Sequence, residues 1–424
     1  MIQKNMKTLL ILISLICLLD ETNGQSLDKL TIEESYRLAT ENYPLTKQRE
    51  LISRSEEYSL SNAAKGILPV ITINGQDSYQ SDVTNIPIEV PEVIEELSKH
   101  QYKIYGELSA NLYDGGVIRN QKESYRANAK IDEQKLEVEL YKLKDRINQL
   151  FFGILLLDAQ LVQNELLKSD IQRGIERINA SIANGIALKS SADVLHAEYL
   201  KADQKTIELH ASRHAYIEML GLMIGETLND STRLEKPASL TLSSAINRPE
   251  LRLYDYQRDA IDVQTRMLAT RNRPKLSLFF QGGYGRPALD MLDNQPEAYY
   301  ITGIRLNWTI SGFYTYKKEK ALLSINQTNL DLQKQTFIHN TNLSLNNHRG
   351  EVSKLHNVMA TDDQIIALRE KIKNTAAAQL ENGVINSNDY LREVTAEDLA
   401  RQNKILHEIQ LLLAQYNLQT TTGI

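Results

Sequence analysis

The chain has 424 residues, a formal net charge of −6 and a single cysteine. A mildly acidic chain without a basic block is not expected to bind nucleic acid, and one cysteine excludes a disulfide framework and a thiolate metal site. Because no nucleophile motif, metalloprotease box or pair of catalytic carboxylates is apparent, we predict no enzymatic activity, no cofactor and no metal.

Residues 1–24 have the pattern of a secretory signal peptide. Lys4 and Lys7 form a basic start, and the apolar run 9–19 follows. This run is too short for a membrane helix, which needs about 20 residues. The only cysteine, Cys17, lies within it and follows a large residue rather than a small one. We therefore expect cleavage before Gln25 and no lipid anchor.

The rest of the chain, 25–424, contains an internal two-fold duplication, with repeats at about 27–235 and 236–424. In each repeat two prolines stand 25 positions apart, a glycine follows a strand pattern, and an Asn-Gly pair follows a long helical pattern. A repeat this long indicates duplication of half a molecule rather than a short-period solenoid. The paired landmarks are Pro44 and Pro249, Pro69 and Pro274, Gly116 and Gly312, and Asn184-Gly185 and Asn382-Gly383.

Each repeat begins with a short helix and two segments in which apolar and polar residues alternate. Nine of the 20 tyrosines lie on or beside these segments. A strand of about ten residues with one apolar face and a tyrosine girdle is typical of a transmembrane barrel, although a soluble sheet with one wet face has the same alternation. The predicted strands lie near 70–83, 102–112, 275–283 and 299–309, with Pro69 and Pro274 as strand entries.

A very long helix follows each strand pair. It begins after glycines that we interpret as strand-to-helix exits, and proline is absent between 92 and 236 and after 296. The first long helix, about 118–183, carries an a/d seam of Leu and Ile, and the second spans about 314–381. Phe151 to Leu157 is the most apolar stretch of the first long helix. Because Asp158 ends this stretch, we expect no helix to span a membrane. The exits are Gly115, Gly116 and Gly312.

Both long helices end at an Asn-Gly pair, the expected left-handed helix stop. A second helix then begins near Ser190 in the first repeat and near Asn388 in the second. The sequence therefore predicts two long antiparallel helical hairpins, with turns at Asn184-Gly185 and Asn382-Gly383.

Four strands cannot form a membrane barrel, since a closed barrel needs at least about eight and lipid forbids open edges. Several chains must then share one barrel, and twelve strands from three chains are the natural solution. The predicted fold is mostly α with β. The long antiparallel helical hairpins form an α-helical barrel, and each chain contributes four strands to a shared trimeric transmembrane β-barrel.

At this point the chain resembles the TolC-like outer-membrane efflux protein family over residues 27–420. The resemblance rests on the opening helix from Leu30 to Pro44, on Leu68-Pro69 and Arg273-Pro274, and on the run from Leu112 to Gly116. It implies a homotrimeric, porin-like duct in the outer membrane of a Gram-negative bacterium, with its helical tube in the periplasm. The implied partners are a periplasmic adaptor (membrane fusion) protein, an inner-membrane pump of the RND or ABC type, and outer-membrane lipid.

The resemblance also implies a periplasmic aperture ringed by acidic side chains that follow the hairpin turns. The matching residue is Asp389 in the second repeat and Asp193 in the first, and three copies of Asp389 would attract cations. Arg392 stands where a second acid is expected, and at i+3 it can pair with Asp389. An acid stabilised by the helix dipole is an equally good interpretation of Asp389.

The alternative function is a periplasmic or surface coiled-coil structural protein, which the long seams alone would suit. The strand alternation, the tyrosines and the paired prolines argue against it. His210 and His214 have i, i+4 spacing, but without a third ligand we interpret them as solvated side chains. Nothing in the sequence identifies the exported cargo.

Overall fold

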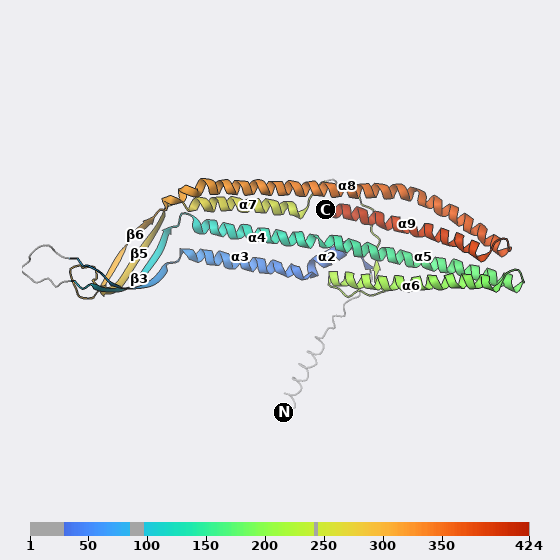
Figure 1. The fold of residues 1–424 in the computed structure, drawn as a ribbon, viewed down its shortest axis with the longest axis horizontal. Helices are drawn as coiled ribbons and strands as arrows, with labels where there is room; N and C mark the ends of the chain where they lie inside the picture. Colours follow the sequence, from blue (N-terminus) through green and yellow to red (C-terminus); the bar gives the residue numbers. More distant parts are fainter. Residues whose placement is uncertain (1–28, 85–96, 241–244, 424) are drawn as a thin grey trace, which may run out of the picture. The chain divides into compact units, whose positions relative to one another are not determined.

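The computed structural model describes residues 29–84, 97–240 and 245–423, so the predicted signal peptide lies outside the described residues. The chain divides into two compact units, and each unit takes segments from both repeats (Figure 1). The hairpin unit comprises the described residues of Met1–Thr46, Val138–Arg248 and Ile338–Ile424, and the sheet unit comprises those of Lys47–Glu137 and Pro249–Phe337.

The hairpin unit contains the turns of both helical hairpins, which lie at the green and orange-red ends of the helices in Figure 1. Helix α5 packs along α6 and along α9, and α2 crosses α5 and α6. A two-residue parallel ladder joins β1 to β4. The elements are β1 (Lys29–Leu30), α2 (Ile32–Asn42), α5 (Leu143–Ala183), α6 (Lys189–Ile224), β4 (Arg233–Leu234), the last part of α8 (Phe313–Glu381) and α9 (Ser387–Thr422).

The sheet unit contains helices α3, α4 and α7, the first part of α8, and four strands. Side-chain ion pairs join α3 to α4, α4 to α7, and α7 to α8. Its elements are α3 (Gln48–Ala64), η2 (Lys65–Ile67), β2 (Val70–Tyr79), β3 (His100–Tyr113), α4 (Val117–Tyr141), α7 (Pro249–Thr270), β5 (Lys275–Arg286), β6 (Glu297–Asn307) and η3 (Ile310–Gly312), and η1 (Pro44–Lys47) precedes α3.

The first long helix is interrupted once, whereas the second is continuous. Lys142 separates α4 from α5, and its backbone stays near helical values with φ −63° and ψ −17°. Its amide still reaches the carbonyl of Val138 at 3.3 Å. Helix α8 runs through 69 residues without a break. The prediction of two very long helices is therefore confirmed, with a local irregularity that the sequence did not reveal.

The apolar seam of α5 forms the core of the hairpin unit. By length and composition alone the helical segment Val117–Ala183 would suffice to cross a membrane, which our sequence expectation had not allowed. Ile147, Phe151 and Ile154 are completely buried, however, and α5 packs against three other helices. Packing within the protein accounts for this seam, so we attach no membrane role to it.

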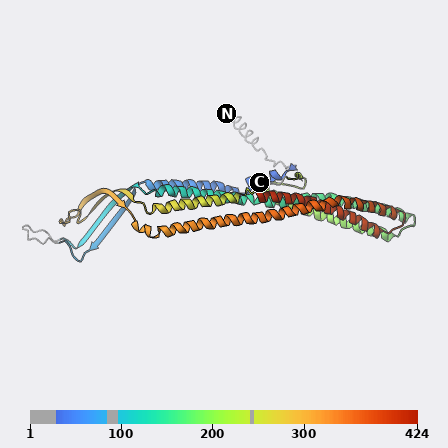
Figure 2. The ribbon, with the colours of Figure 1, turned by 90° about the horizontal axis from the view of Figure 1, so that it is seen from above.

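The four strands form one antiparallel sheet in the order β2-β3-β5-β6, whose arrows lie toward the left in Figure 2. β3 pairs with β5 through ten residue pairs before a bulge near Asn111, so the central ladder joins the two repeats. β2 ends at Tyr79, earlier than the predicted limit near 83. Within the described chain, β2 and β6 are edge strands with one partner each.

The register places large exposed apolar side chains on one face of the sheet, here called the apolar face. The opposite face carries mainly Thr, Ser, Asn, Gln and charged residues; Val70 and Ile301 are its exposed apolar side chains, and Tyr105, Phe279 and Tyr299 lie half-buried on it. Because an ordinary soluble sheet buries its apolar face on a core, exposed side chains of this kind need a different environment. They are Ile71, Ile73, Tyr79, Tyr102, Ile104, Leu108, Leu278, Phe280, Tyr284, Tyr300, Ile304 and Leu306.

Candidate constriction site at the hairpin turns

The two hairpin turns have the same backbone structure. The amide of Gly185 donates to Ile182 at 3.0 Å and the next amide donates to Ser181 at 2.8 Å; Gly383 and its successor repeat this pattern at 3.1 and 2.8 Å. These are the paired hydrogen bonds of a Schellman helix end. Gly185 and Gly383 have φ of +74° and +71°, a region that favours glycine. The Asn-Gly pairs thus have a direct structural role in both turns.

The two turns lie against each other. A Cβ on Gly383 would lie only 3.0 Å from the side chain of Ile186 in the other turn. Behind the turns, α5, α6, α8 and α9 share a buried apolar cluster that includes Leu195, Leu380 and Tyr390. The Tyr390 ring lies over Gly174, where a Cβ would come within 2.6 Å. The two hairpins therefore form one packed tip within the hairpin unit.

Asp389 lies in the first turn of α9, on the surface of this tip. The side chain of Asn386 caps the helix by accepting a hydrogen bond from the Asp389 amide at 3.0 Å. Arg392 pairs with the Asp389 carboxylate at 3.4 Å and with Glu393 at 3.1 Å. The ion pair suggested by the i+3 spacing is therefore present. Asp389 has the position of a dipole-stabilised acid and also remains 39% exposed, so both interpretations of this residue stay open.

Asp193 occupies a different place on its helix from Asp389. Helix α6 begins at Lys189, four residues after Gly185, and α9 begins at Ser387, four residues after Gly383. Ser191 is therefore the structural counterpart of Asp389, and Asp193 lies two residues further along its helix. Asp193 is exposed, and it has no ion pair within the described part of the chain. The sequence match relied on a shared Asp-x-Leu pattern, which is weaker evidence than the position of the turn.

A buried ionic cluster joins three helices near the tip, and the sequence analysis missed it. The ammonium group of Lys373 on α8 lies 2.7 Å from Asp170 on α5 and 3.2 Å from Glu397 on α9. Arg173 pairs with Asp170, and Arg401 pairs with Glu397. Burial disfavours the Lys373 charge, but the hydrogen bonds and charges of the two carboxylates outweigh it and raise the Lys373 pKa.

Asp398 lies next to this cluster and behaves differently. Burial raises the pKa of its carboxyl, an effect that hydrogen bonds from Gln163 (2.9 Å) and Gln402 (2.7 Å) only partly oppose. No cation pairs with Asp398 among the described residues. None of these partners is close in sequence except Gln402, so only the fold brings the group together.

The predicted strand exits differ between the repeats. In the first, Gly115 and Gly116 have φ of +73° and +87°, and the Asp114 side chain accepts hydrogen bonds from the amides of Gly116 (2.8 Å) and Ile118 (2.7 Å). In the second, Gly312 ends the short helix η3, and a Cβ there would lie 2.2 Å from Asn272. One exit thus needs glycine for its backbone conformation and the other for space.

Pro69 and Pro274 directly precede β2 and β5, as expected for strand entries. The second entry also touches the first exit, because Arg273 donates a hydrogen bond to the carbonyl of Gly115 at 3.2 Å. The strand entries and exits therefore hold the inner end of the sheet on the helices of the sheet unit.

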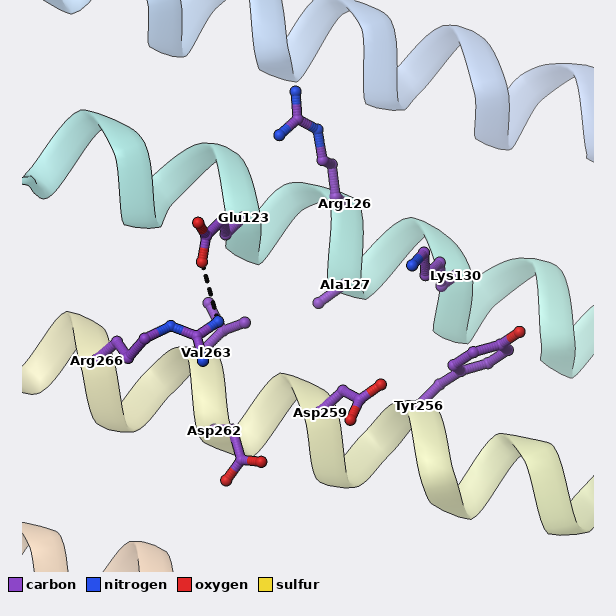
Figure 3. A pocket seen from close by; sticks show the side chains of 9 residues that line it. All are labelled: Glu123, Arg126, Ala127, Lys130, Tyr256, Asp259, Asp262, Val263 and Arg266. Atoms are coloured by element: carbon purple, nitrogen blue, oxygen red, sulfur yellow. Dashed lines mark hydrogen bonds and ion pairs between the residues drawn. The ribbon is translucent and has the colours of Figure 1, made fainter.

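A shallow groove of about 320 Å³ runs between α4 and α7 (Figure 3). The dashed line in Figure 3 marks the ion pair between Glu123 and Arg266, whose atoms lie 2.9 Å apart. The hydrogen bond from Arg266 lowers the Glu123 pKa. Arg126 points away from the α7 acids Asp259 and Asp262. These charges do not converge on one point, so the groove has the character of a solvated helix-helix surface.

Comparison with known proteins identifies the fold. No model of a protein family matches the sequence, and no curated protein matches it. Among solved structures, CusC, described in terms of transmembrane channel formation, superposes with a TM-score of 0.68 at 14% identity, covering 92% of each chain. The outer membrane protein VceC of Vibrio cholerae gives a TM-score of 0.66 at 11% identity, covering 92% of this chain and 96% of VceC.

The MtrE outer membrane channel of Neisseria gonorrhoeae, in its open state, gives a TM-score of 0.65 at 12% identity, covering 92% of this chain and 88% of MtrE. The predicted TolC-like fold is confirmed by these structures. Identities of 11–14% establish the fold and leave the function of this chain to be argued from its own residues.

Proposed function

We propose that the chain is one protomer of a homotrimeric exit duct in the outer membrane of a Gram-negative bacterium. The observation that carries the proposal is the apolar face of the sheet, whose large side chains are exposed in the single chain. Side chains such as Ile73 and Ile304, with exposed fractions of 79% and 64%, suit contact with lipid. The polar face would then line an aqueous lumen. The channel fold supports this assignment.

The trimer follows from the edges of the sheet. Among residues 29–84, 97–240 and 245–423, four strands form this sheet, and β2 and β6 each have one edge without a partner. Unpaired backbone amides and carbonyls are not tolerated in lipid. Pairing β2 of one copy with β6 of the next removes all edges in a closed ring, and three copies provide twelve strands.

The duct is passive and belongs to a tripartite efflux or type I secretion system. Engagement of a periplasmic adaptor and an inner-membrane pump, of the RND or ABC type, opens it. The support is the resemblance in fold and the design of the hairpin tip, which combines packed apolar side chains with charged groups on its surface. In this assembly three copies of Asp389, each paired with Arg392, surround the periplasmic aperture.

The decisive experiment is the native mass of the full chain, extracted in mild detergent from the outer-membrane fraction. A trimer in that fraction is the expected result, since the sheet edges and the apolar face both require shared assembly in lipid. A monomer or dimer in the soluble fraction would contradict the proposal, and the alternative of a periplasmic or surface coiled-coil structural protein would replace it.

A further inference from the structure

Helices α6 and α8 are the outer helices of the hairpin unit. Figure 1 shows them on either side of α5 and α9. Helix α6 packs on α5, and α8 packs on α9 through a buried cluster of Val352, Leu355, Leu411 and Ala414. Each outer helix therefore turns one face toward an inner helix and keeps another face exposed.

The exposed face of α6 carries an evenly spaced row of apolar, small and amide side chains, here called the α6 seam. Leu200 and Ile207 are 63% and 67% exposed. All five members are exposed, with spacings of 3, 4, 3 and 4 residues: Ala197, Leu200, Gln204, Ile207 and Ala211. These are the a/d spacings of a coiled coil. Because an α-helix turns about 100° per residue, the α6 seam lies on a different face from the buried residues of this helix.

Helix α8 carries a matching row, here called the α8 seam. Its large members are apolar, and Leu368 is 63% exposed. Its six members are exposed and have the same alternating spacing: Val358, Thr361, Ile365, Leu368, Ile372 and Thr375. The buried Val352 and Leu355, which pack on α9, lie outside this row. A heptad row of large exposed apolar side chains is typical of a helix that packs on a second helix outside the chain.

The two seams run in opposite directions at matching heights. Helix α6 begins at its hairpin turn and α8 ends at the other, and the two turns lie against each other. Leu200 is fifteen residues after Gly185, and Leu368 is fifteen residues before Gly383. Copies that cross a membrane in one orientation keep these heights. The α6 seam of one copy can therefore meet the α8 seam of the next as an antiparallel pair.

Side chains at matching heights are complementary in size. Counted from the two glycines, Ala197 has the height of Ile372 within one residue. Ala211 has the height of Val358 to the same precision. Small side chains of one seam thus face large side chains of the other. Pairing α6 with α6 would instead set alanine against alanine and leave gaps, which close-packed protein interiors rarely contain.

The same contact also fits the edges of the sheet unit. Helix α3 leads into β2 and exposes Leu51 and Tyr58, seven residues apart. Helix α8 follows β6 and exposes Ile325 and Leu332, also seven residues apart. Pairing of β2 with β6 of the next copy therefore brings these two helix faces toward each other as well. A head-to-tail contact of this kind generates a closed ring when its rotation closes.

We propose that the α6 seam of one copy and the α8 seam of the next form an antiparallel coiled coil. The inference rests on the proposed trimer, and it goes further by naming the partner and the side chains that close the hairpin units into a ring. Gln204 and Thr361 are polar members of the two seams and lie within three residues of each other in height. A polar group at such a position fixes the register of a coiled coil at some cost in stability.

The test is disulfide cross-linking of the full chain in its native membrane. A chain with Leu200→Cys and Leu368→Cys should form covalent dimers and trimers under mild oxidation. The matched control is Leu200→Cys with Glu370→Cys, because Glu370 has nearly the same height but pairs with Arg401 and so faces α9. Two cysteines join only when their Cα atoms lie within about 7 Å, so we expect about tenfold more cross-linked chains than in the control. The wild-type chain, whose one cysteine is Cys17, gives the background.

Native mass of the same samples before oxidation separates failure of the seam from failure of the proposed function. Covalent dimers from co-expressed Leu200→Cys and Leu368→Cys chains would support the seam and exclude a bond within one chain. A trimer without cross-links above the control would overturn the seam and leave the duct intact, whereas a monomer without cross-links would overturn both. Cross-links in Leu200→Cys alone would show that α6 pairs with α6, which also overturns the proposal.

Discussion

At the scale of single residues, the hairpin tip depends on charges that are taken out of water. Lys373, Asp170 and Glu397 are each at most 14% exposed, and the three lie on different helices. Buried ions gain little over a well-packed apolar contact, but removing one partner is costly because the remaining charge stays buried. The cluster therefore fixes which helix faces meet at the tip.

Replacing Lys373 by Met should lower the free energy of unfolding by about 3 kcal/mol, the lower part of the range for a broken buried pair. The effect is limited because Arg173 and Arg401 still pair with the two acids. Lys404→Met is the control, since its partner Asp363 is 76% exposed and such surface pairs contribute about 1 kcal/mol or less. Urea denaturation measures both; equal effects would show that the cluster is no more than a surface feature.

Asp398 gives a pH prediction. Because burial raises its pKa in the folded chain, the residue favours folding at pH values below its unfolded pKa of about 4, and this contribution is lost as pH rises through the folded value. At neutral pH the buried carboxylate is therefore destabilising. Asp398→Asn should raise the melting temperature at pH 7.5 and change it less at pH 4. Asp193→Asn is the control, because its side chain is exposed. A stabilisation that is independent of pH would refute this account.

At the scale of elements, the long helices depend on the absence of proline as much as on their apolar seams. α5 passes through Leu150 in the middle of its buried seam, and the second copy, α8, runs unbroken for 69 residues. Proline at such a position removes a backbone hydrogen bond and clashes with the preceding turn.

Leu150→Pro should therefore destabilise the hairpin unit by about 3 kcal/mol or more and prevent assembly. Lys189→Pro is the matched control. Lys189 is the first residue of α6, and the preceding Leu188 is extended with φ −85° and ψ 148°, which suits a residue before proline. Native mass and circular dichroism compare the two variants. A wild-type assembly of Leu150→Pro would contradict the structural role of the seam.

Features set by local chemistry were predictable from sequence, and features set by distant contacts were not. The Asn-Gly turns and the strand entry at Pro274 need particular residues, so the sequence displays them. The break at Lys142 has no such residue. The Lys373 cluster joins positions about 200 residues apart in the case of Asp170, and no spacing in the sequence relates them. Asp193 was misplaced because a three-residue pattern was weighed above the turn.

At the scale of the whole molecule, the apolar face predicts where the sheet resides. Leu278 and Ser277 are neighbours on β5 with side chains on opposite faces of the sheet. Leu278→Lys should cost about 2–4 kcal/mol if that face meets the middle of a bilayer, whereas Ser277→Lys should be tolerated on the polar face. The amount of trimer in the outer-membrane fraction measures both. Equal tolerance of the two lysines would contradict a lipid environment.

Three copies of Asp389 give a second prediction at this scale. If they surround the aperture, Asp389→Ala should reduce the cation preference of the reconstituted pore, and Arg392→Ala should increase it by releasing the Asp389 charge. Reversal potentials in a salt gradient measure both. An acid that serves only the helix dipole would instead cost about 0.3–1 kcal/mol of stability and leave ion selectivity unchanged.

The pairing of β3 with β5 also constrains how the protein is made. Tyr102 pairs with Arg286, so the central ladder closes only after about 180 further residues have been synthesised. Contacts at such separation form slowly, and until then the first two strands present an apolar surface and an open edge to any other chain. A nascent chain that consists of the first repeat alone is therefore an aggregation hazard rather than a half-built molecule. Because the sheet interleaves its two halves, we expect the unfinished chain to need a holding chaperone until the second repeat is present.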